Sequence, residues 1–288
     1  MDATGAGATG VIAPGRVAVV TGAASGIGLG LTRRFAAEGM RVVMADVEAP
    51  VLEAAAADLA RTGAQVLPVR TDVADAASVA ALRDAALAEF GAVHLLCNNA
   101  GVGGSQDPLW EVPLGDLEWV FGVNLWGVVH GVRAFLPVLQ EQDAAHIVTT
   151  SSVFGLFAGS LGAYGASKHA AVALTESLHF QLREAGSHVG VTLLCPSAVR
   201  TNFDTSSRNR PASAGPAADT GAVTRAARAE LHARSAPPRE PDEVAELVVD
   251  AVRTGRFYVL TNAARDGAIR GRAEEVIAGG PPTPPLSW

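Results

Sequence analysis

The chain of 288 residues has little cysteine and almost no lysine. Its two cysteines, Cys97 and Cys195, are too few for a disulfide framework, and we expect both to be reduced, as is usual in a cytoplasmic protein. Neither CxxC nor HExxH spacing occurs among the residues, so we expect no structural or catalytic metal. Lys168 is the one lysine beside 21 arginines, which suggests that this position needs an ammonium group rather than a guanidinium.

Charge and long apolar runs are also scarce. Charged residues make up 18% of the chain and the net charge is −7, which argues against a nucleic-acid binder that neutralises phosphates. Hydrophobic residues reach 49%, but no run attains the ~18 uncharged apolar residues of a membrane-spanning helix. The first ten residues lack the basic and apolar regions of a secretory signal. We therefore expect a cytoplasmic protein with neither nucleic acid nor membrane as a partner.

Short β-branched runs alternate with longer helical stretches from Val17 onward. The strand-like runs are 17–20, 41–46, 64–69, 93–101, 146–152, 189–197 and 256–262, and the helical stretches are 29–39, 51–63, 78–91, 113–139, 163–185 and 243–255. The strand runs are nearly continuously apolar, which is typical of a parallel sheet with helices on both faces. The pattern predicts one α/β domain over 15–265, a doubly wound (Rossmann) fold with a seven-stranded parallel sheet.

Three segments interrupt or flank this alternation. Residues 1–14 are rich in Gly, Ala and Thr and are expected to be a disordered tail, so that the core begins at Val17. Residues 203–240 are rich in Pro, Ser, Ala and Arg, and we expect a mobile substrate lid with a helix near 219–234; the same composition permits a rigid arm that contacts another subunit. Residues 266–288 form a C-terminal extension that ends in a Pro-rich tail.

A glycine-rich turn joins the first strand to the first helix in the string VAVVTGAASGIG. Gly22 permits a tight exit from the strand, while Gly26 and Gly28 let the backbone approach a pyrophosphate and the helix pack on the sheet. The position of the turn between a strand and a helix is the context that a dinucleotide site requires. With these glycines, Ser25 and Ile27 complete the predicted phosphate-binding turn.

Carboxylates and small residues end the next three strands. Asp46 ends the second strand 18 residues after Gly28, where it can accept from both ribose hydroxyls of NAD and repel the 2′-phosphate of NADP. The alternative is an ordinary solvated acid, but Ser25 and Val47, which are not basic, also favour NAD. The adenine would lie beside the end of the third strand and the ribose beside the end of the fourth, at Asp72, Val73, Asn99, Ala100 and Gly101.

Tyr164 and Lys168 stand four residues apart in YGASK, on one face of a predicted helix. A phenol with a pKa of ~10 is a poor base at neutral pH, and an adjacent cation favours the phenolate. The chain has only two tyrosines, so this spacing arises by chance only rarely. The pair indicates general acid–base catalysis.

These motifs together resemble the single-domain short-chain dehydrogenase/reductases, in order over about residues 16–203. The motifs are TGAASGIG (21–28), Asp46, NNAG (98–101), Asn124, SSVFG (151–155), YGASK (164–168) and CPSAVRT (195–201). The resemblance implies that a serine polarises the substrate oxygen, Tyr164 transfers the proton, Lys168 binds the nicotinamide ribose, and Asn124 holds a water linked to Lys168. It also implies association through helices near 113–139 and 163–185, as a homodimer or homotetramer.

Two positions depart from the family pattern. The usual spacing before the tyrosine leads to Ser151, whereas the SSVFG motif leads to Ser152, which we prefer because strand register is harder to shift than loop length. Ser197 stands where the family usually has a glycine after proline, which leaves Val199 and Thr201 to meet the nicotinamide carboxamide.

The expected activity is NAD-dependent interconversion of a secondary alcohol and a ketone. The alternatives are an NADPH-dependent carbonyl reductase, which Asp46 disfavours, and a non-catalytic dinucleotide sensor, which an intact Tyr164–Lys168 pair disfavours. An uncharged segment, 155–163, and nearby aromatic residues suggest an apolar pocket for an aryl, alicyclic or steroid-like substrate; the alternative is that these residues pack against the lid or a neighbouring subunit. The expected substrate-binding residues are Phe154, Phe157 and Phe203.

Overall fold

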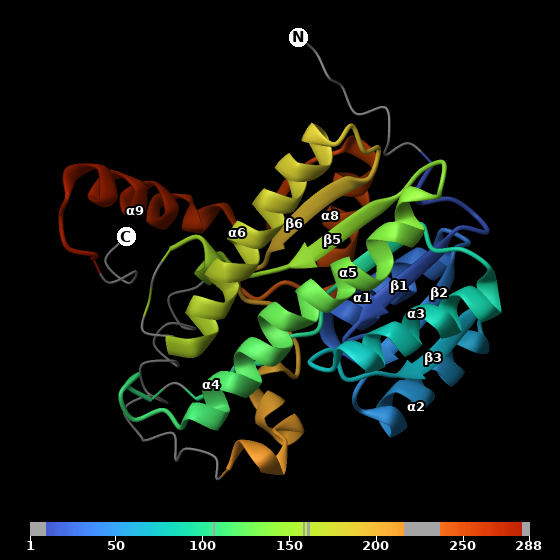
Figure 1. The fold of residues 1–288 in the computed structure, drawn as a ribbon, viewed down its shortest axis with the longest axis horizontal. Helices are drawn as coiled ribbons and strands as arrows, with labels where there is room; N and C mark the ends of the chain where they lie inside the picture. The colour runs from blue at the N-terminus through green and yellow to red at the C-terminus, as the bar shows by residue number, and fades with distance from the viewer. Residues whose placement is uncertain (1–9, 106, 158, 160–161, 216–236, 284–288) are drawn as a thin grey trace.

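The structure is a computed structural model that describes residues 10–105, 107–157, 159, 162–215 and 237–283 (Figure 1). Seven strands form one parallel sheet in the order β3-β2-β1-β4-β5-β6-β7. They are β1 Val17–Thr21, β2 Arg41–Asp46, β3 Val66–Arg70, β4 Leu95–Asn98, β5 His146–Thr150, β6 Gly190–Cys195 and β7 Tyr258–Leu260. The order reverses direction between β1 and β4, which confirms the doubly wound fold and provides a crevice at the carboxyl ends of these strands.

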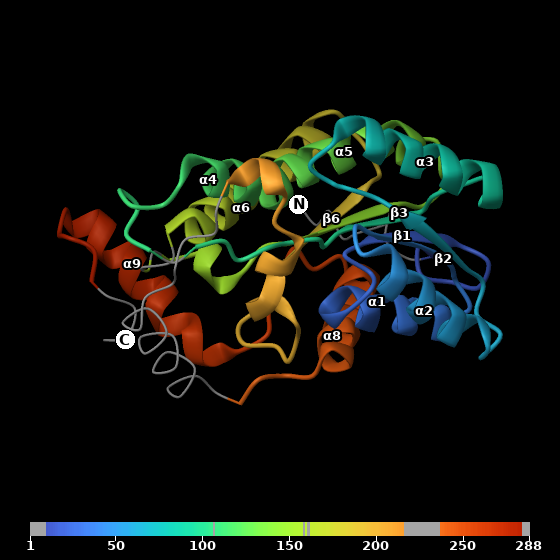
Figure 2. The same cartoon turned by 90° about the horizontal axis from the view of Figure 1, so that it is seen from below.

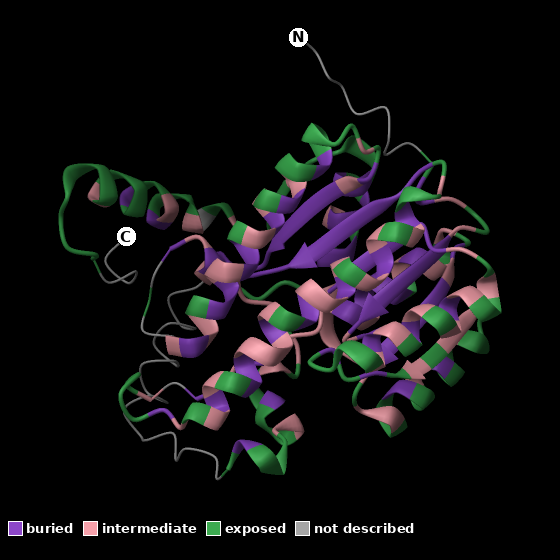
Figure 3. Cartoon of the chain, viewed as in Figure 1, coloured by how far each residue is buried: buried purple, intermediate pink, exposed green. Residues whose placement is uncertain are grey.

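Helices cover both faces of the sheet (Figure 2). One layer contains α1 Gly26–Ala37, α2 Ala49–Ala60 and α8 Pro241–Thr254, and the other contains α3 Ala76–Phe90, α5 Gly127–Gln140 and α6 Gly162–Glu184. In β1 the side chains of Ala18 and Val20 enter the core under the first layer, and those of Val17 and Val19 enter the core under the second. Every residue of β1 is therefore buried, as the purple strands of Figure 3 show.

The predicted helix over 113–139 consists of three parts: α4 Leu114–Phe121, a π-helical turn Gly122–Trp126, and α5. By length and composition alone this stretch, Leu114–Gln140, could cross a membrane, with a mean hydropathy of 1.2. One such helix is a weak indication, because a core helix of a soluble protein passes the same test. Here it packs on α3 and α6.

The core begins earlier than the sequence predicted. Val11 is fully buried and Ile12 is 7% exposed, and both belong to the core under α1 and α8. The backbone of Gly15 donates to the Gly39 carbonyl over 2.8 Å and fixes this segment beside the end of α1. Two adjacent apolar side chains are enough to order residues 10–14, and the rest of the predicted tail, 1–9, lies outside the described residues.

The segment after β6 crosses the carboxyl edge of the sheet as two 3-10 turns, η3 Phe203–Asn209 and η4 Ala212–Ala214. The Arg210 guanidinium joins this segment to α4 through Asp116, with 2.9 Å between Nε and Oδ1 and both side chains almost fully buried. Residues 203–215 are thus held by specific polar contacts. The predicted helix near 219–234 lies outside the described residues.

The C-terminal extension contains a helix, α9 Asp266–Ala278, that follows the short turn η5 Ala263–Arg265 and projects from the body of the molecule (Figure 1). Its first turn buries Ala268 against Val153 and Phe157, in and beside the 3-10 turn η2 Val153–Gly155. The far end of the helix leaves Val276 and Ile277 exposed. The extension thus contacts the segment that follows β5.

Candidate active site

A cavity of about 720 Å³ opens at the carboxyl ends of the strands. The sequence-predicted residues that line it are Gly22, Ser25, Gly26, Ile27, Gly28, Asp46, Val47, Asp72, Val73, Asn99, Ala100, Gly101, Ser152, Phe154, Tyr164, Lys168, Val199, Thr201 and Phe203. Asn124 and Phe157 do not line it. Among the described residues, no group of three His, Cys, Asp or Glu side chains is arranged to hold a metal ion.

The glycine-rich turn has the tight shape that its sequence predicted. Gly22 and Gly26 adopt φ angles of +67° and +52°, which favour glycine. A Cβ on Gly28 would collide with the Gly22 carbonyl oxygen, so the start of α1 lies directly against the turn. The N-terminus of α1 therefore faces the cavity with free backbone amides and a positive dipole end, which suits a pyrophosphate.

Asp46 is fixed at the end of β2 by two backbone amides. Its Oδ2 accepts from the Ala24 amide at 3.0 Å, and its Oδ1 accepts from the Glu48 amide at 3.1 Å. The carboxylate therefore stays at the rim of the cavity, next to the glycine-rich turn. Its register partner in β3 is Arg70, which lines the same end of the cavity.

The NNAG loop is locked to β1 through Thr21. The Thr21 hydroxyl accepts from the amides of Asn99 and Ala100 at 2.9 and 3.1 Å, and the Asn99 side chain donates to the Thr21 carbonyl at 2.9 Å. A Cβ on Gly101 would lie 3.2 Å from the Lys168 ammonium nitrogen. The small residues of this loop thus leave room for Lys168 to reach the cavity.

Lys168 lies one helical turn from Tyr164 in α6, with its Nζ 5.9 Å from the centroid of the phenol ring. The ammonium donates to the Thr150 carbonyl at the end of β5 over 3.0 Å. Burial lowers the pKa of Lys168 to about 8. Two of its three protons remain for other acceptors.

The pKa of Tyr164 differs from the sequence-based expectation. Burial raises the pKa of this phenol to about 12, although a hydrogen bond with the Ser152 hydroxyl acts in the opposite direction. The expected depression by the neighbouring cation is wrong, because the loss of hydration on burial is the largest influence on the pKa of this phenol.

The structure gives Ser151 and Ser152 different partners. The Ser151 hydroxyl donates to the Lys168 carbonyl in α6 at 2.9 Å, so it fastens the helix to the sheet. The Ser152 hydroxyl accepts from the Phe154 amide at 3.2 Å and hydrogen-bonds with Tyr164. Only Ser152 is thus paired with the phenol, which supports the choice made from the SSVFG motif.

Asn124 lies one layer behind the cavity, in the π-helical turn. Its side chain pairs with both backbone groups of Val102, at 2.8 and 2.9 Å, and donates to the Ser167 hydroxyl at 3.0 Å. Asn124 therefore ties the loop after β4 to α6, beside Lys168.

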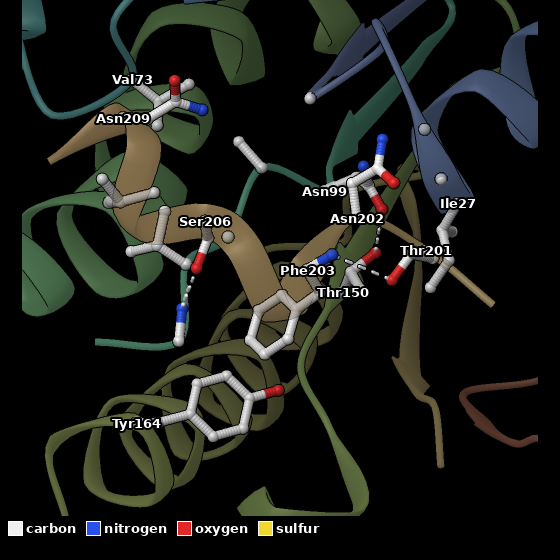
Figure 4. Close-up of a pocket in the computed structure, with 18 of the residues that line it drawn as sticks. Ile27, Val73, Asn99, Thr150, Tyr164, Thr201, Asn202, Phe203, Ser206 and Asn209 are labelled. Atoms are coloured by element: carbon white, nitrogen blue, oxygen red, sulfur yellow. Dashed lines mark hydrogen bonds between the residues drawn. The ribbon is translucent and has the colours of Figure 1, made fainter. Parts of the chain in front are cut away.

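The apolar end of the cavity contains two of the three predicted phenylalanines. Phe203 lies 5.2 Å from the Tyr164 ring, measured between centroids, and Figure 4 shows both rings at the cavity. Phe154 also lines the wall. Phe157 does not, and this prediction is wrong: its ring is 2% exposed and packs between Phe154 and α9, whose presence the sequence pattern did not reveal.

Several residues that line the cavity escaped the sequence analysis. They include Glu48, Arg70, Trp119, Ser206, Arg208, Asn209 and Arg265. The η3 residues among them meet the cavity by contacts between segments more than 100 residues apart, as when Ser206 accepts from the Gly103 amide at 3.0 Å. Of these residues, only Glu48 could have been predicted to line the cavity, because it lies two positions after Asp46 at the end of β2.

The arrangement agrees with what comparison with known proteins finds. The family model for short chain dehydrogenases matches residues 16–212. A 1-deoxy-11-beta-hydroxypentalenate dehydrogenase of Streptomyces exfoliatus is 41% identical over 276 residues, covering 93% of this chain and 92% of that one. A C alpha-dehydrogenase of a Sphingobium species is 34% identical over 249 residues, covering 85% and 80%.

A solved structure is also similar along nearly the whole chain. It is a short chain dehydrogenase/reductase from Burkholderia phymatum in complex with NAD, with a TM-score of 0.90 and 46% identity, covering 96% of this chain and 99% of that one. The fold, the glycine-rich turn, the Tyr164–Lys168 pair and these matches lead to one conclusion. The chain belongs to the short-chain dehydrogenase/reductase family, the NAD(P)-dependent oxidoreductases that act on CH–OH groups.

Proposed function

We propose that the protein interconverts a secondary alcohol and a ketone with NAD as the preferred cofactor. One observation carries the proposal: Ser152, Tyr164 and Lys168 meet in one cavity whose other end holds the glycine-rich turn and Asp46. The first group suits proton transfer at a substrate oxygen. The second suits the pyrophosphate and the adenosine ribose of a dinucleotide.

Each side chain then has a role in alcohol oxidation. Ser152 holds the hydroxyl oxygen, and Tyr164 as phenolate takes its proton. Lys168 favours the phenolate and can donate to ribose hydroxyls with the protons that Thr150 does not use. Asn124 ties the loop after β4 to Ser167, the residue that precedes Lys168 in α6. When bound, an oxidised dinucleotide would supply the hydride acceptor for the carbinol hydrogen and a positive charge that favours the Tyr164 phenolate.

The cofactor-binding residues follow the carboxyl edge of the sheet. The pyrophosphate would lie on the turn made by Gly22, Ser25, Gly26, Ile27 and Gly28, with the adenosine beside Asp46, Val47, Asp72 and Val73. The nicotinamide half would lie beside Asn99, Ala100, Gly101, Val199 and Thr201. Asp46 favours NAD over the NADPH-dependent alternative.

The substrate is proposed to be apolar, with an alicyclic or aryl carbon skeleton. Phe154 and Phe203 line the wall beside Tyr164, together with Val102 and Trp119. Relatives that act on a hydroxypentalenate and on a C alpha position agree with such a substrate. We also propose a homodimer or homotetramer, since Trp126, at the end of the π-helical turn before α5, and Phe180 in α6 are exposed.

The test is a panel of secondary alcohols, assayed with NAD and NADP in parallel by the appearance of reduced cofactor. We expect kcat/KM to be at least about tenfold higher with NAD, and Asp46→Asn to narrow that ratio. Equal use of both cofactors by the unmodified protein would overturn the NAD assignment.

Tyrosine substitution tests the chemistry. Tyr164→Phe should lower kcat by about 10²- to 10⁴-fold and leave the Kd for NADH, from fluorescence titration, nearly unchanged. Tyr258→Phe is the matched control, because Tyr258 is the other tyrosine and bonds to Glu176 at the surface. If Tyr164→Phe retains more than about a tenth of the activity, the general acid–base role is wrong.

A further inference from the structure

Glu48 connects the end of β2 to η3 across the cavity. Its carboxylate accepts two bonds from the Arg208 guanidinium, Nε to Oε2 at 3.0 Å and Nη2 to Oε1 at 2.6 Å. Asn209 donates a third, from Nδ2 to Oε1 at 2.8 Å. All three side chains line the cavity, so the contact lies at its wall. Segments 160 residues apart in the chain thus meet at the adenosine end of the site.

This contact lies directly beside Asp46. The Glu48 backbone amide donates to Asp46 Oδ1 at 3.1 Å, so the carboxylate proposed to bind the ribose and the residue that binds Arg208 are two positions apart and in direct contact through that amide. A 2′-phosphate would be attached to the ribose hydroxyl that Asp46 serves. Arg208 is the basic residue of η3, it lines the cavity beside this position, and Glu48 occupies the planar edge of its guanidinium.

Arg208 has a second anchor that does not involve Glu48. Its Nη1 donates to the Asn202 carbonyl at 3.1 Å and to the Thr205 hydroxyl at 3.0 Å. The guanidinium would stay at the cavity wall if the carboxylate of Glu48 were removed. Its Nε and Nη2 would then be the fork that binds a phosphate in bidentate fashion.

We propose that Glu48 is a second determinant of cofactor choice, which excludes NADP by holding the phosphate-binding edge of Arg208 and by adding a negative charge beside Asp46. The inference rests on the proposed NAD preference and assigns part of it to a residue outside the glycine-rich turn and the end of β2. With Glu48 and Arg208 paired, the adenosine end presents no free edge of this guanidinium to a 2′-phosphate.

The test measures binding by fluorescence titration with NADH and NADPH, so it does not depend on a substrate. Glu48→Gln keeps the size of the side chain and removes its charge. We expect it to lower the Kd for NADPH about five- to tenfold, and to change the Kd for NADH less than about threefold. Retained NADH binding also shows that the variant is folded.

Two arginine variants show which guanidinium receives the phosphate. Arg208→Gln alone should leave NADPH binding weak. Combined with Glu48→Gln, it should abolish the increase in NADPH affinity that Glu48→Gln produces. Arg70→Gln is the matched control, because Arg70 lines the same end of the cavity without contacting Glu48 through any hydrogen bond among the described residues. Added to Glu48→Gln, it should preserve most of the gain.

The outcomes separate this inference from the proposed function. Equal Kd values for NADH and NADPH in the unmodified protein would overturn the NAD preference itself. If that preference holds but Glu48→Gln shifts both Kd values in parallel, or its gain survives Arg208→Gln, then Glu48 does not determine cofactor choice through Arg208.

Discussion

The ammonium nitrogen of Lys168 lies 5.9 Å from the centre of the Tyr164 ring and is anchored to the Thr150 carbonyl. The cation is thus held over the phenol by the sheet rather than by the phenol itself. Burial nevertheless dominates both groups, because it raises the pKa of Tyr164 to about 12 and lowers that of Lys168 to about 8. At neutral pH the Tyr164 phenol therefore keeps its proton.

The cofactor-free protein should show almost no tyrosinate absorbance at pH 10. Burial raises the pKa of Tyr164 to about 12, and partial burial together with the bond to the Glu176 carboxylate raises the pKa of Tyr258 to about 12. About 1% of each would be ionised at pH 10, whereas about half of a free tyrosine would be. The measurement is ultraviolet difference titration near 295 nm, with the urea-unfolded protein as control. A midpoint below pH 10 that disappears in Tyr164→Phe would contradict the burial argument.

Replacing the two adjacent serines should have separate effects. Ser152→Ala removes the hydroxyl that pairs with Tyr164, and we expect kcat to fall about a hundredfold or more. Ser151→Ala removes the bond to the Lys168 carbonyl, so it should lower the free energy of unfolding by about 1 kcal/mol and leave kcat within a few-fold. Steady-state kinetics and urea unfolding check both, and the reverse pattern would make Ser151 the catalytic serine.

Asp116→Asn should destabilise the protein by about 3 kcal/mol, because it leaves the buried Arg210 guanidinium without its charged partner. Asp116 also accepts from the Ser105 amide at 2.7 Å, so the substitution also weakens the contact that holds the loop after β4. Urea unfolding measures the change. Asp84→Asn is the control, since its pair with Arg83 is exposed and should contribute less than about 1 kcal/mol. Similar losses from both variants would show that burial does not strengthen the first pair.

The two cysteines should be unreactive in the native protein. Both are free and buried, and β5 separates β4, which carries Cys97, from β6, which carries Cys195. Burial raises the pKa of Cys195 to about 12 and that of Cys97 higher still, so almost no thiolate forms at pH 8. A thiol reagent should count no groups in the folded protein and two after unfolding without reductant. Rapid reaction of either thiol in the folded state would contradict this burial.

The sequence was sufficient for the fold and for most of the cavity wall, because those features depend on local pattern. Apolar runs are a reliable indication of buried strands, and a glycine-rich turn before a helix is a reliable indication of a dinucleotide site. Four of the predicted strand starts agree with the structure: 17, 41, 146 and, within one residue, 189. Spacing within one helix was enough to pair Tyr164 with Lys168. Local pattern could not decide whether Ser151 or Ser152 is the catalytic serine, because only their hydrogen-bond partners distinguish them.

The errors came from contacts between distant segments. Phe157 was predicted to meet the substrate, but α9 covers it, and no local pattern indicates where a C-terminal helix docks. Val11 and Ile12 were assigned to a tail because an isolated apolar pair has too little surface to fold alone, yet it fills the edge of an existing core. The predicted direction of the Tyr164 pKa shift was wrong for a related reason, since the loss of hydration depends on all the segments that surround the side chain.

The docking of α9 on the turn that follows Ser152 also divides the molecule for the purposes of protein engineering. The glycine-rich turn, Asp46 and the NNAG loop all precede residue 102, whereas Ala268 supports Val153 from the last part of the chain. Exchanging the C-terminal extension for that of a relative would change the packing on the turn that follows Ser152 and leave the sequence of the glycine-rich turn, Asp46 and the NNAG loop unchanged.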